Sequence, residues 1–286
     1  MENTSVIDNI IGQEDLVKRV SRIFEIFIET NGIIKPNFII TGESGSGKTF
    51  IINTLCEAYN LPIISINASQ ITKEGISGNS LSKVLKPINN YKGREIICFV
   101  DEFDKLFITG NGTQSTPPEI SSVQNELLKI VEGDTTEVYD NYGKYMTIDI
   151  SKVLFVFAGA FNGDDVSIHY LLNCGVKTEF LGRVSLIFQT DRIDLDKIIE
   201  RLNTNKLLQN YCIFYNKDIE EVLKDLSPYI RKHFYTHNFG MRFINTTIHQ
   251  YFIYDMDVSK LEKLNNGTPQ NEKNKLIEPK SKFMFK

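Results

Sequence analysis

A short glycine-rich stretch constrains this chain more than any other part of its sequence. The stretch reads Gly42, Glu43, Ser44, Gly45, Ser46, Gly47, Lys48 and Thr49. It follows an apolar run at residues 38–41 and precedes a helical pattern at residues 48–59. Glycines let successive backbone N–H groups point inward at phosphate oxygens, and the helix offers its positive N-terminus to the same anion. The stretch therefore predicts a phosphate-binding loop between a strand and a helix.

The residues that close this loop have separate roles in nucleotide binding. Lys48 is expected to reach the β and γ phosphates of ATP, and the Thr49 hydroxyl is expected to bind Mg²⁺. We assign the whole run from Gly42 through Phe50 to the nucleotide site. The alternative is a flexible glycine turn that binds no ligand.

Two acidic residues, Asp101 and Glu102, follow the apolar run at residues 96–100. Consecutive side chains of an extended strand point in different directions, so one carboxylate can hold Mg²⁺ while its neighbour faces an attacking water. We predict that Asp101 binds the metal. We also predict that Glu102 acts as the general base, since a glutamate carboxylate is ionised at neutral pH. Taken alone, such a pair is equally typical of solvated surface acids.

Short apolar runs alternate with segments of helical period in the first two thirds of the chain. The strand candidates are residues 38–41, 63–67, 96–101, 153–157 and 184–188. This order predicts an α/β fold with a five-stranded parallel sheet flanked by helices. After Asp191 the helical pattern takes over, and Asp194 is a candidate N-cap. We expect a large nucleotide-binding domain at residues 1–190, a small helical domain at 191–261 and a flexible polar tail at 262–286.

Composition narrows the classes of partner. The 32 basic and 36 acidic residues give a net charge of −4, which does not favour nucleic acid or an anionic membrane. No apolar stretch approaches the roughly 20 residues that a membrane-spanning helix needs. The polar, acidic start argues against a secretion signal, so we expect a cytoplasmic protein with no membrane contact. The four cysteines have no paired spacing and are expected to be buried or partly buried thiols.

Further motifs follow one another along the chain. They are residues 10–13 (Ile-Ile-Gly-Gln), 100–105 (Val-Asp-Glu-Phe-Asp-Lys), 122–133, 149–155, 158–161 (Ala-Gly-Ala-Phe), 179–183 (Glu-Phe-Leu-Gly-Arg) and 240–242 (Gly-Met-Arg). With the phosphate-binding loop, this order resembles the AAA+ ATPases, and within them the ClpX and HslU branch of protein unfoldases, over residues 10–255. The resemblance implies ATP hydrolysis by a ring of identical subunits, expected to be a hexamer, that acts on a protein substrate.

The resemblance also implies roles for residues outside the loop. Ile10 and Ile11 are expected to pack around adenine. Arg183 is expected to enter the ATP site of a neighbouring subunit, where a guanidinium neutralises charge on the transferring phosphoryl group. Arg242 is expected to be the second sensor, carried by the small domain to the nucleotide of its own subunit. The alternatives are core packing for the isoleucines and ordinary surface charge for the arginines.

The chain departs from the family pattern in its pore loops and at the first sensor. The substrate-gripping pore loop is matched by Gly75, Ile76, Ser77 and Gly78. It lacks the aromatic residue of the family, so its apolar grip is expected to be weaker. The second pore loop, at residues 134–146, is acidic where that of ClpX is basic. The polar first-sensor residue is not evident at residues 157–159, and none is assigned.

Three expected absences concern partners. Only residues 162–178 separate the Ala-Gly-Ala-Phe segment from the motif at residues 179–183 that ends in Arg183, too few for the loop with which ClpX docks onto the ClpP peptidase. The residues before Ile10 are too few for the zinc-binding domain of ClpX, and the inserted domain of HslU is lacking. We expect a protein remodeller that is not coupled to ClpP. The alternatives are a helicase or clamp-loader type of AAA+ protein acting with nucleic acid, and a nucleotide-gated scaffold.

Overall fold

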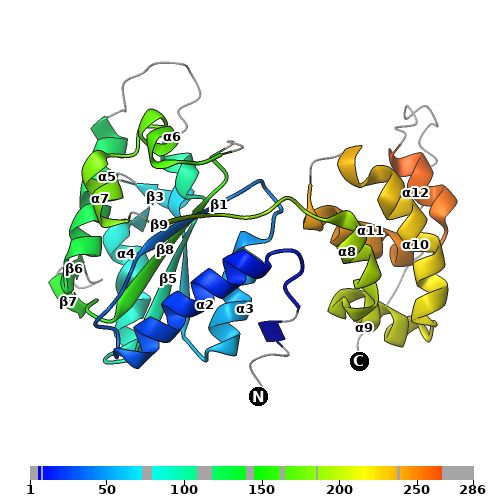
Figure 1. The fold of residues 1–286 in the computed structure, drawn as a ribbon, viewed down its shortest axis with the longest axis horizontal. Coiled ribbons are helices and arrows are strands. Elements are labelled where there is room, and N and C mark those ends of the chain that lie inside the picture. Colours follow the sequence, from blue (N-terminus) through cyan, green and yellow to red (C-terminus); the bar gives the residue numbers. More distant parts are fainter. Residues whose placement is uncertain are drawn as a thin grey trace, which may run out of the picture.

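The computed structural model describes residues 6–7, 9–72, 79–107, 118–139, 145–161, 165–184, 186–236 and 239–265. An α/β part built on a central sheet comes first along the chain, and a group of helices follows it (Figure 1). The predicted fold class is therefore confirmed. No helix in the described ranges is long and apolar enough to span a membrane.

The central sheet has five parallel strands in the order β2-β5-β8-β1-β9. These strands are β1 (Phe38–Thr41), β2 (Ile63–Asn67), β5 (Ile96–Asp101), β8 (Val153–Gly159) and β9 (Leu186–Gln189). Thr41 pairs with both Gly159 and Gln189, so the carboxyl ends of the central strands meet at one edge. Ligands of open parallel sheets bind at this kind of edge.

The strand predictions are accurate for β1, β2 and β5 and inexact for the last two strands. Strand β8 runs two residues beyond the predicted end, to Gly159. Strand β9 begins at Leu186, because the preceding helix α7 (Thr178–Arg183) continues to Arg183 and Val184 forms its C-cap. The apolar residue Val184 therefore belongs to a helix end.

Helices cover both faces of the sheet (Figure 1). One apolar cluster joins α2 (Glu14–Glu29) and α3 (Lys48–Ala58) to Phe38 and Ile40 of β1. A second cluster joins Ile39 of the same strand to α4 (Leu81–Leu85), α5 (Pro118–Glu132), α6 (Ile168–Asn173) and α7. Side chains alternate along a strand, so successive apolar residues enter opposite clusters. This explains why the central strands read as unbroken apolar runs.

Several short elements were not predicted. Strands β3 (Ile71–Thr72) and β4 (Asn79–Ser80) pair in parallel, and β6 (Thr135–Tyr139) and β7 (Tyr145–Asp149) form an antiparallel pair. Short 3-10 helices connect larger elements: η1 (Ala68–Gln70), η2 (Lys86–Tyr91), η3 (Phe103–Leu106), η4 (Leu202–Thr204) and η5 (Phe234–Thr236). The β6–β7 pair occupies the region of the expected second pore loop, whose residues 140–144 lie outside the described ranges.

The C-terminal helices have an apolar core of their own. They are α8 (Leu195–Glu200), α9 (Lys206–Tyr215), α10 (Ile219–His233), α11 (Met241–Ile253) and α12 (Val258–Asn265). The predicted cap is confirmed, since the Asp194 side chain accepts a hydrogen bond from the backbone N–H of Lys197. The domain boundaries at residues 190/191 and 261/262 stay a prediction.

Candidate nucleotide-binding site

The glycine-rich stretch forms the turn between β1 and α3, at the carboxyl edge of the sheet. Gly42 has φ of +146°, and a Cβ there would overlap the hydroxyl of Thr190. Gly45 has φ of +81°, and a Cβ there would overlap the backbone carbonyl oxygen of Phe239. The loop therefore needs glycine at both positions for space as well as for backbone conformation.

Lys48 begins helix α3 and folds back over the loop. Its Nζ donates hydrogen bonds to the carbonyl oxygens of Gly42 (2.7 Å) and Glu43 (2.9 Å). Burial lowers the pKa of Lys48, and the nearby carboxylates of Asp101 and Asp104 oppose that shift. The ammonium group is thus held within the concave loop, where an anion would replace the carbonyl oxygens as its partner.

Thr49 and Asp101, the two predicted metal ligands, lie in contact although 52 residues separate them in the chain. The Thr49 hydroxyl donates a hydrogen bond of 3.0 Å to Oδ2 of Asp101. The other carboxylate oxygen of Asp101 accepts a hydrogen bond of 2.8 Å from the backbone N–H of Glu102. Hydroxyl and carboxylate oxygens are the hard donors that Mg²⁺ prefers.

Glu102 directly follows strand β5 and has a left-handed backbone, with φ of 55° and ψ of 32°. Such a conformation costs a non-glycine residue about 1–3 kcal/mol and is concentrated at functional sites. Its side chain is exposed, whereas that of Asp101 is half-buried. The two adjacent carboxylates therefore differ in exposure because of a left-handed turn, and not because of the strand alternation assumed from the sequence; their roles as metal ligand and base stay a prediction.

Helix α11 touches the loop through its first turn. The backbone N–H of Met241 donates a hydrogen bond of 3.1 Å to the carbonyl oxygen of Gly45. The guanidinium of Arg242 donates a hydrogen bond of 3.4 Å to the Ser44 hydroxyl, and its charge helps to lower the pKa of Lys48. The structure thus brings Arg242 to the loop of its own chain.

An apolar hollow of about 410 Å³ lies on one side of the loop. Ile11, Gly47 and Phe50 line it from the α/β part, and Ile198, Leu202 and Met241 line it from the helical part. Its size and apolar walls suit an aromatic base. Of the two predicted adenine contacts, Ile11 lines the hollow, whereas Ile10 is buried in the apolar cluster of α2 and α3.

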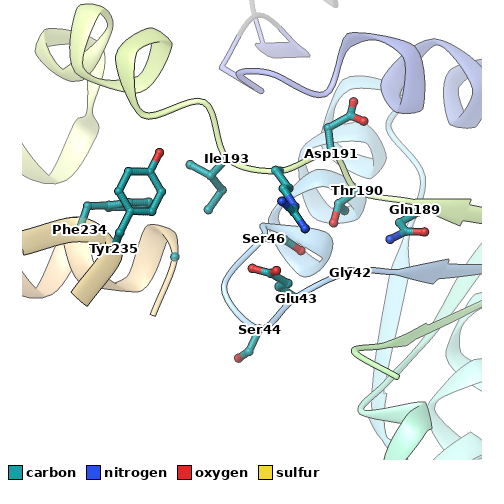
Figure 2. A pocket seen from close by; sticks show the side chains of 12 residues that line it. Gly42, Glu43, Ser44, Ser46, Gln189, Thr190, Asp191, Ile193, Phe234 and Tyr235 are labelled. Atoms are coloured by element: carbon teal, nitrogen blue, oxygen red, sulfur yellow. The ribbon is translucent and has the colours of Figure 1, made fainter. Parts of the chain in front are cut away.

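A second hollow, of about 640 Å³, is lined by Gly42, Glu43, Ser44 and Ser46 of the loop. It is bounded by the loop, by the connection from β9 to α8, and by η5, whose Phe234 and Tyr235 lie across from Ile193 (Figure 2). The hydroxyls of Ser46 and Thr190 are buried here without a hydrogen-bond partner in the described part of the chain.

The comparison with known families decides the class of this site. The model of the ATPase family associated with various cellular activities (AAA) matches residues 38–209, which is more than half of the chain. This chain belongs to the AAA family of ATPases. The matched region contains the phosphate-binding loop, the Thr49–Asp101 contact and Arg183. The chain is therefore a nucleotide-binding ATPase of the AAA+ class.

Three individual relatives all carry the name of the ClpX subunit. The chain is 27% identical over 221 residues to "ATP-dependent Clp protease ATP-binding subunit ClpX 2" of Wolinella succinogenes, covering 64% of this chain and 55% of that protein. It is 25% identical over 331 residues to ClpX of Borrelia duttonii, covering 94% of this chain and 77% of that protein. It is 28% identical over 223 residues to ClpX of Treponema denticola, covering 70% of this chain and 52% of that protein. The chain thus spans about half the length of two of these relatives, and it is ClpX-like.

Other predicted site residues lie away from the loop or outside the described ranges. Arg183 lines neither hollow; it ends α7, and its Nε donates a hydrogen bond of 2.6 Å to Oε1 of Glu132. The predicted pore loop at residues 75–78 lies outside the described ranges. Its role stays a prediction.

Two features of this AAA+ site were not found from the sequence. Gln13 joins the segment before α2 to the β9–α8 connection, because its amide exchanges two hydrogen bonds of 2.9 Å with the backbone of Asp191. Asp104 is 1% exposed and lies against Gly159, where a Cβ would come within 2.9 Å of the backbone nitrogen of Asp104. A side chain at position 159 therefore has no room beside Asp104 and Phe161.

Proposed function

We propose that this chain is an ATP-dependent protein remodeller that works as a ring of identical subunits, with each ATP hydrolysed between two neighbours. The observation that carries this proposal is that three charged site residues gather at the loop, whereas Arg183 lies elsewhere on the surface. Lys48, Asp101 and Arg242 are drawn together around one loop. Arg183, from the same ordered series of motifs, ends a different helix and has 61% of its side chain exposed. A guanidinium in that position is accessible to a second subunit.

The residues around the loop divide the chemistry of hydrolysis. Thr49 and Asp101 would hold Mg²⁺, which neutralises charge on the β and γ phosphates when bound. Lys48 binds the same phosphates from the loop. Glu102, exposed at the strand end, orients a water and accepts its proton. In related systems a guanidinium supplied by a neighbour, here Arg183, is worth roughly 10³ to 10⁵ in rate.

Arg242 connects hydrolysis to motion. The helix that carries it is tied to the loop by the Met241–Gly45 hydrogen bond of 3.1 Å and by the contact of Arg242 with Ser44. Loss of the γ phosphate removes an anionic partner of Arg242. The angle between the α/β part and the C-terminal helices then changes, which is the mechanical step of this proposal.

A protein client is supported by the ClpX names of the relatives and by the net charge of −4, which disfavours nucleic acid. The short segment at residues 162–178 supports a role without ClpP. Unfolded protein should therefore stimulate ATP hydrolysis at physiological salt. Stimulation by single-stranded DNA in place of unfolded protein would favour the nucleic-acid alternative.

Phosphate release measured at several protein concentrations tests whether two subunits share each ATP site, which we call the shared site. Glu102→Gln and Arg183→Ala should both abolish most ATP turnover while retaining ATP binding, measured with a fluorescent ATP analogue. Arg94→Ala, at an exposed arginine outside the site, should behave like the parent protein. If Arg183→Ala turns over like the parent at every concentration, or if the parent stays monomeric at full activity, the shared site is wrong.

A further inference from the structure

Arg183 has a partner within its own chain. Its Nε donates a 2.6 Å hydrogen bond to Glu132, and 41% of the Glu132 side chain is exposed. Glu132 is the last residue of α5, and Arg183 is the last residue of α7. A carboxylate at a helix C-terminus is disfavoured by the helix dipole. The ion pair with Arg183 offsets that repulsion.

The backbones of the two helices are fixed to each other by contacts away from this pair. Gln124, 1% exposed on α5, donates a 3.1 Å hydrogen bond to the carbonyl oxygen of Gly175 and accepts one of 2.9 Å from the N–H of Lys177. Lys177 is the N-cap of α7. These partly buried contacts hold the start of α7 whether or not the Arg183 side chain moves.

The far side of α7 is anchored as well. Phe180 packs on Phe103, directly after Glu102, and on Phe157 of strand β8, with ring centroids 5.4 Å and 5.1 Å apart. Helix α7 is therefore anchored at both its start and its middle. The side chain of Arg183, exposed at the end of the helix, is the part that can change partner.

We propose that Glu132 holds Arg183 in the unassembled subunit, and that Arg183 exchanges this carboxylate for the nucleotide phosphates of a neighbour when the ring forms. This rests on the proposed function, because it requires that Arg183 acts in a second subunit. Both partners of the guanidinium are anions, so they compete for the same donors. Glu132 is then a positioning residue that raises the protein concentration at which the shared site assembles.

The test measures ATP turnover against protein concentration for the parent, Glu132→Gln and Glu132→Ala. An exposed ion pair is weak, so its loss should lower the half-maximal protein concentration by about two- to fivefold, without lowering the plateau rate. In about 0.5 M salt the difference from the parent should narrow, because exposed charges are then screened. The control is Glu179→Gln, which removes the same charge from an exposed position on α7. It should leave the curve unchanged.

Three outcomes would overturn the proposal: an unchanged half-maximal concentration in both Glu132 variants, the same shift in Glu179→Gln, or a lower plateau rate. Circular dichroism melts show whether each variant is folded. If Glu132→Gln does not fold, Glu132→Ala takes its place in the test. Arg183→Ala separates the two proposals. If Arg183→Ala is inactive while the Glu132 variants match the parent, only the exchange fails. If Arg183→Ala is fully active, the shared site itself fails.

Discussion

Substituting Gly45 by alanine should separate the phosphate-binding loop from the C-terminal helices. A Cβ at this position would overlap the carbonyl oxygen of Phe239 and lie 3.0 Å from its carbonyl carbon. That carbonyl accepts a hydrogen bond of 3.2 Å from the N–H of Arg242, so it belongs to the capped start of α11. The overlap is therefore relieved only when α11 and the loop move apart.

The cost of Gly45→Ala has three parts. An alanine held at φ of +81° costs about 1 kcal/mol or slightly more. Loss of the hydrogen bond from Met241 to the Gly45 carbonyl costs about 1 kcal/mol. Steric overlap that forces a backbone shift costs about 1–3 kcal/mol, although separation of the two parts relieves some of it. We expect a total of about 2–4 kcal/mol.

Urea unfolding followed by circular dichroism, without nucleotide, measures this loss. Gly93→Ala is the matched control, because Gly93 has φ of +77° and a Cβ there would meet nothing within 4 Å. Its free energy of unfolding should fall only by the cost of an alanine at positive φ, about 1 kcal/mol. Equal losses for the two variants would refute the contact between the loop and α11.

Three further predictions concern the fold. Gly159→Ala should lower the free energy of unfolding by about 1–3 kcal/mol, because its Cβ would come within 3.0 Å of Phe161 and Asp104; a melting temperature equal to that of the parent contradicts this. Asp194→Ala should lower the free energy of unfolding in urea by about 1 kcal/mol, because α8 loses its N-cap. Asp194→Asn keeps a capping side chain and should not show this loss. Burial raises the pKa of the Cys56 thiol to about 12, so iodoacetamide at mildly alkaline pH should alkylate native Cys56 at least about tenfold more slowly than the unfolded chain; equal rates would exclude a buried thiol.

Stability at alkaline pH follows from the same thiol. Since the pKa of Cys56 is raised in the folded state from 9.0 to about 12, the unfolded chain releases its proton first. The contribution of this thiol to stability is therefore full below pH 9 and declines as the pH rises toward 12.

Much of the site could be predicted from local sequence. The spacing of Gly42, Gly47 and Lys48 specifies a turn followed by a helix, because each glycine is needed for a backbone conformation set by its near neighbours. The central strands were found because their apolar runs are buried on both faces. Strand β9 was misplaced by two residues, since an apolar residue such as Val184 suits a strand or the end of a buried helix equally well.

Sequence alone supplied the candidates for the chemistry: a glycine-rich loop predicted to bind phosphate, an acid pair at a strand end, and two arginines later in the chain. Only the tertiary structure decided which of them meet. Thr49 reaches Asp101, and Arg242 reaches Ser44 across 198 residues, because strand order and helix packing place their elements side by side. The partner of Arg183 was likewise invisible, since the pairing with Glu132 depends on how α7 packs on α5. Contacts between distant residues are set by the packing of whole elements, which no local pattern encodes.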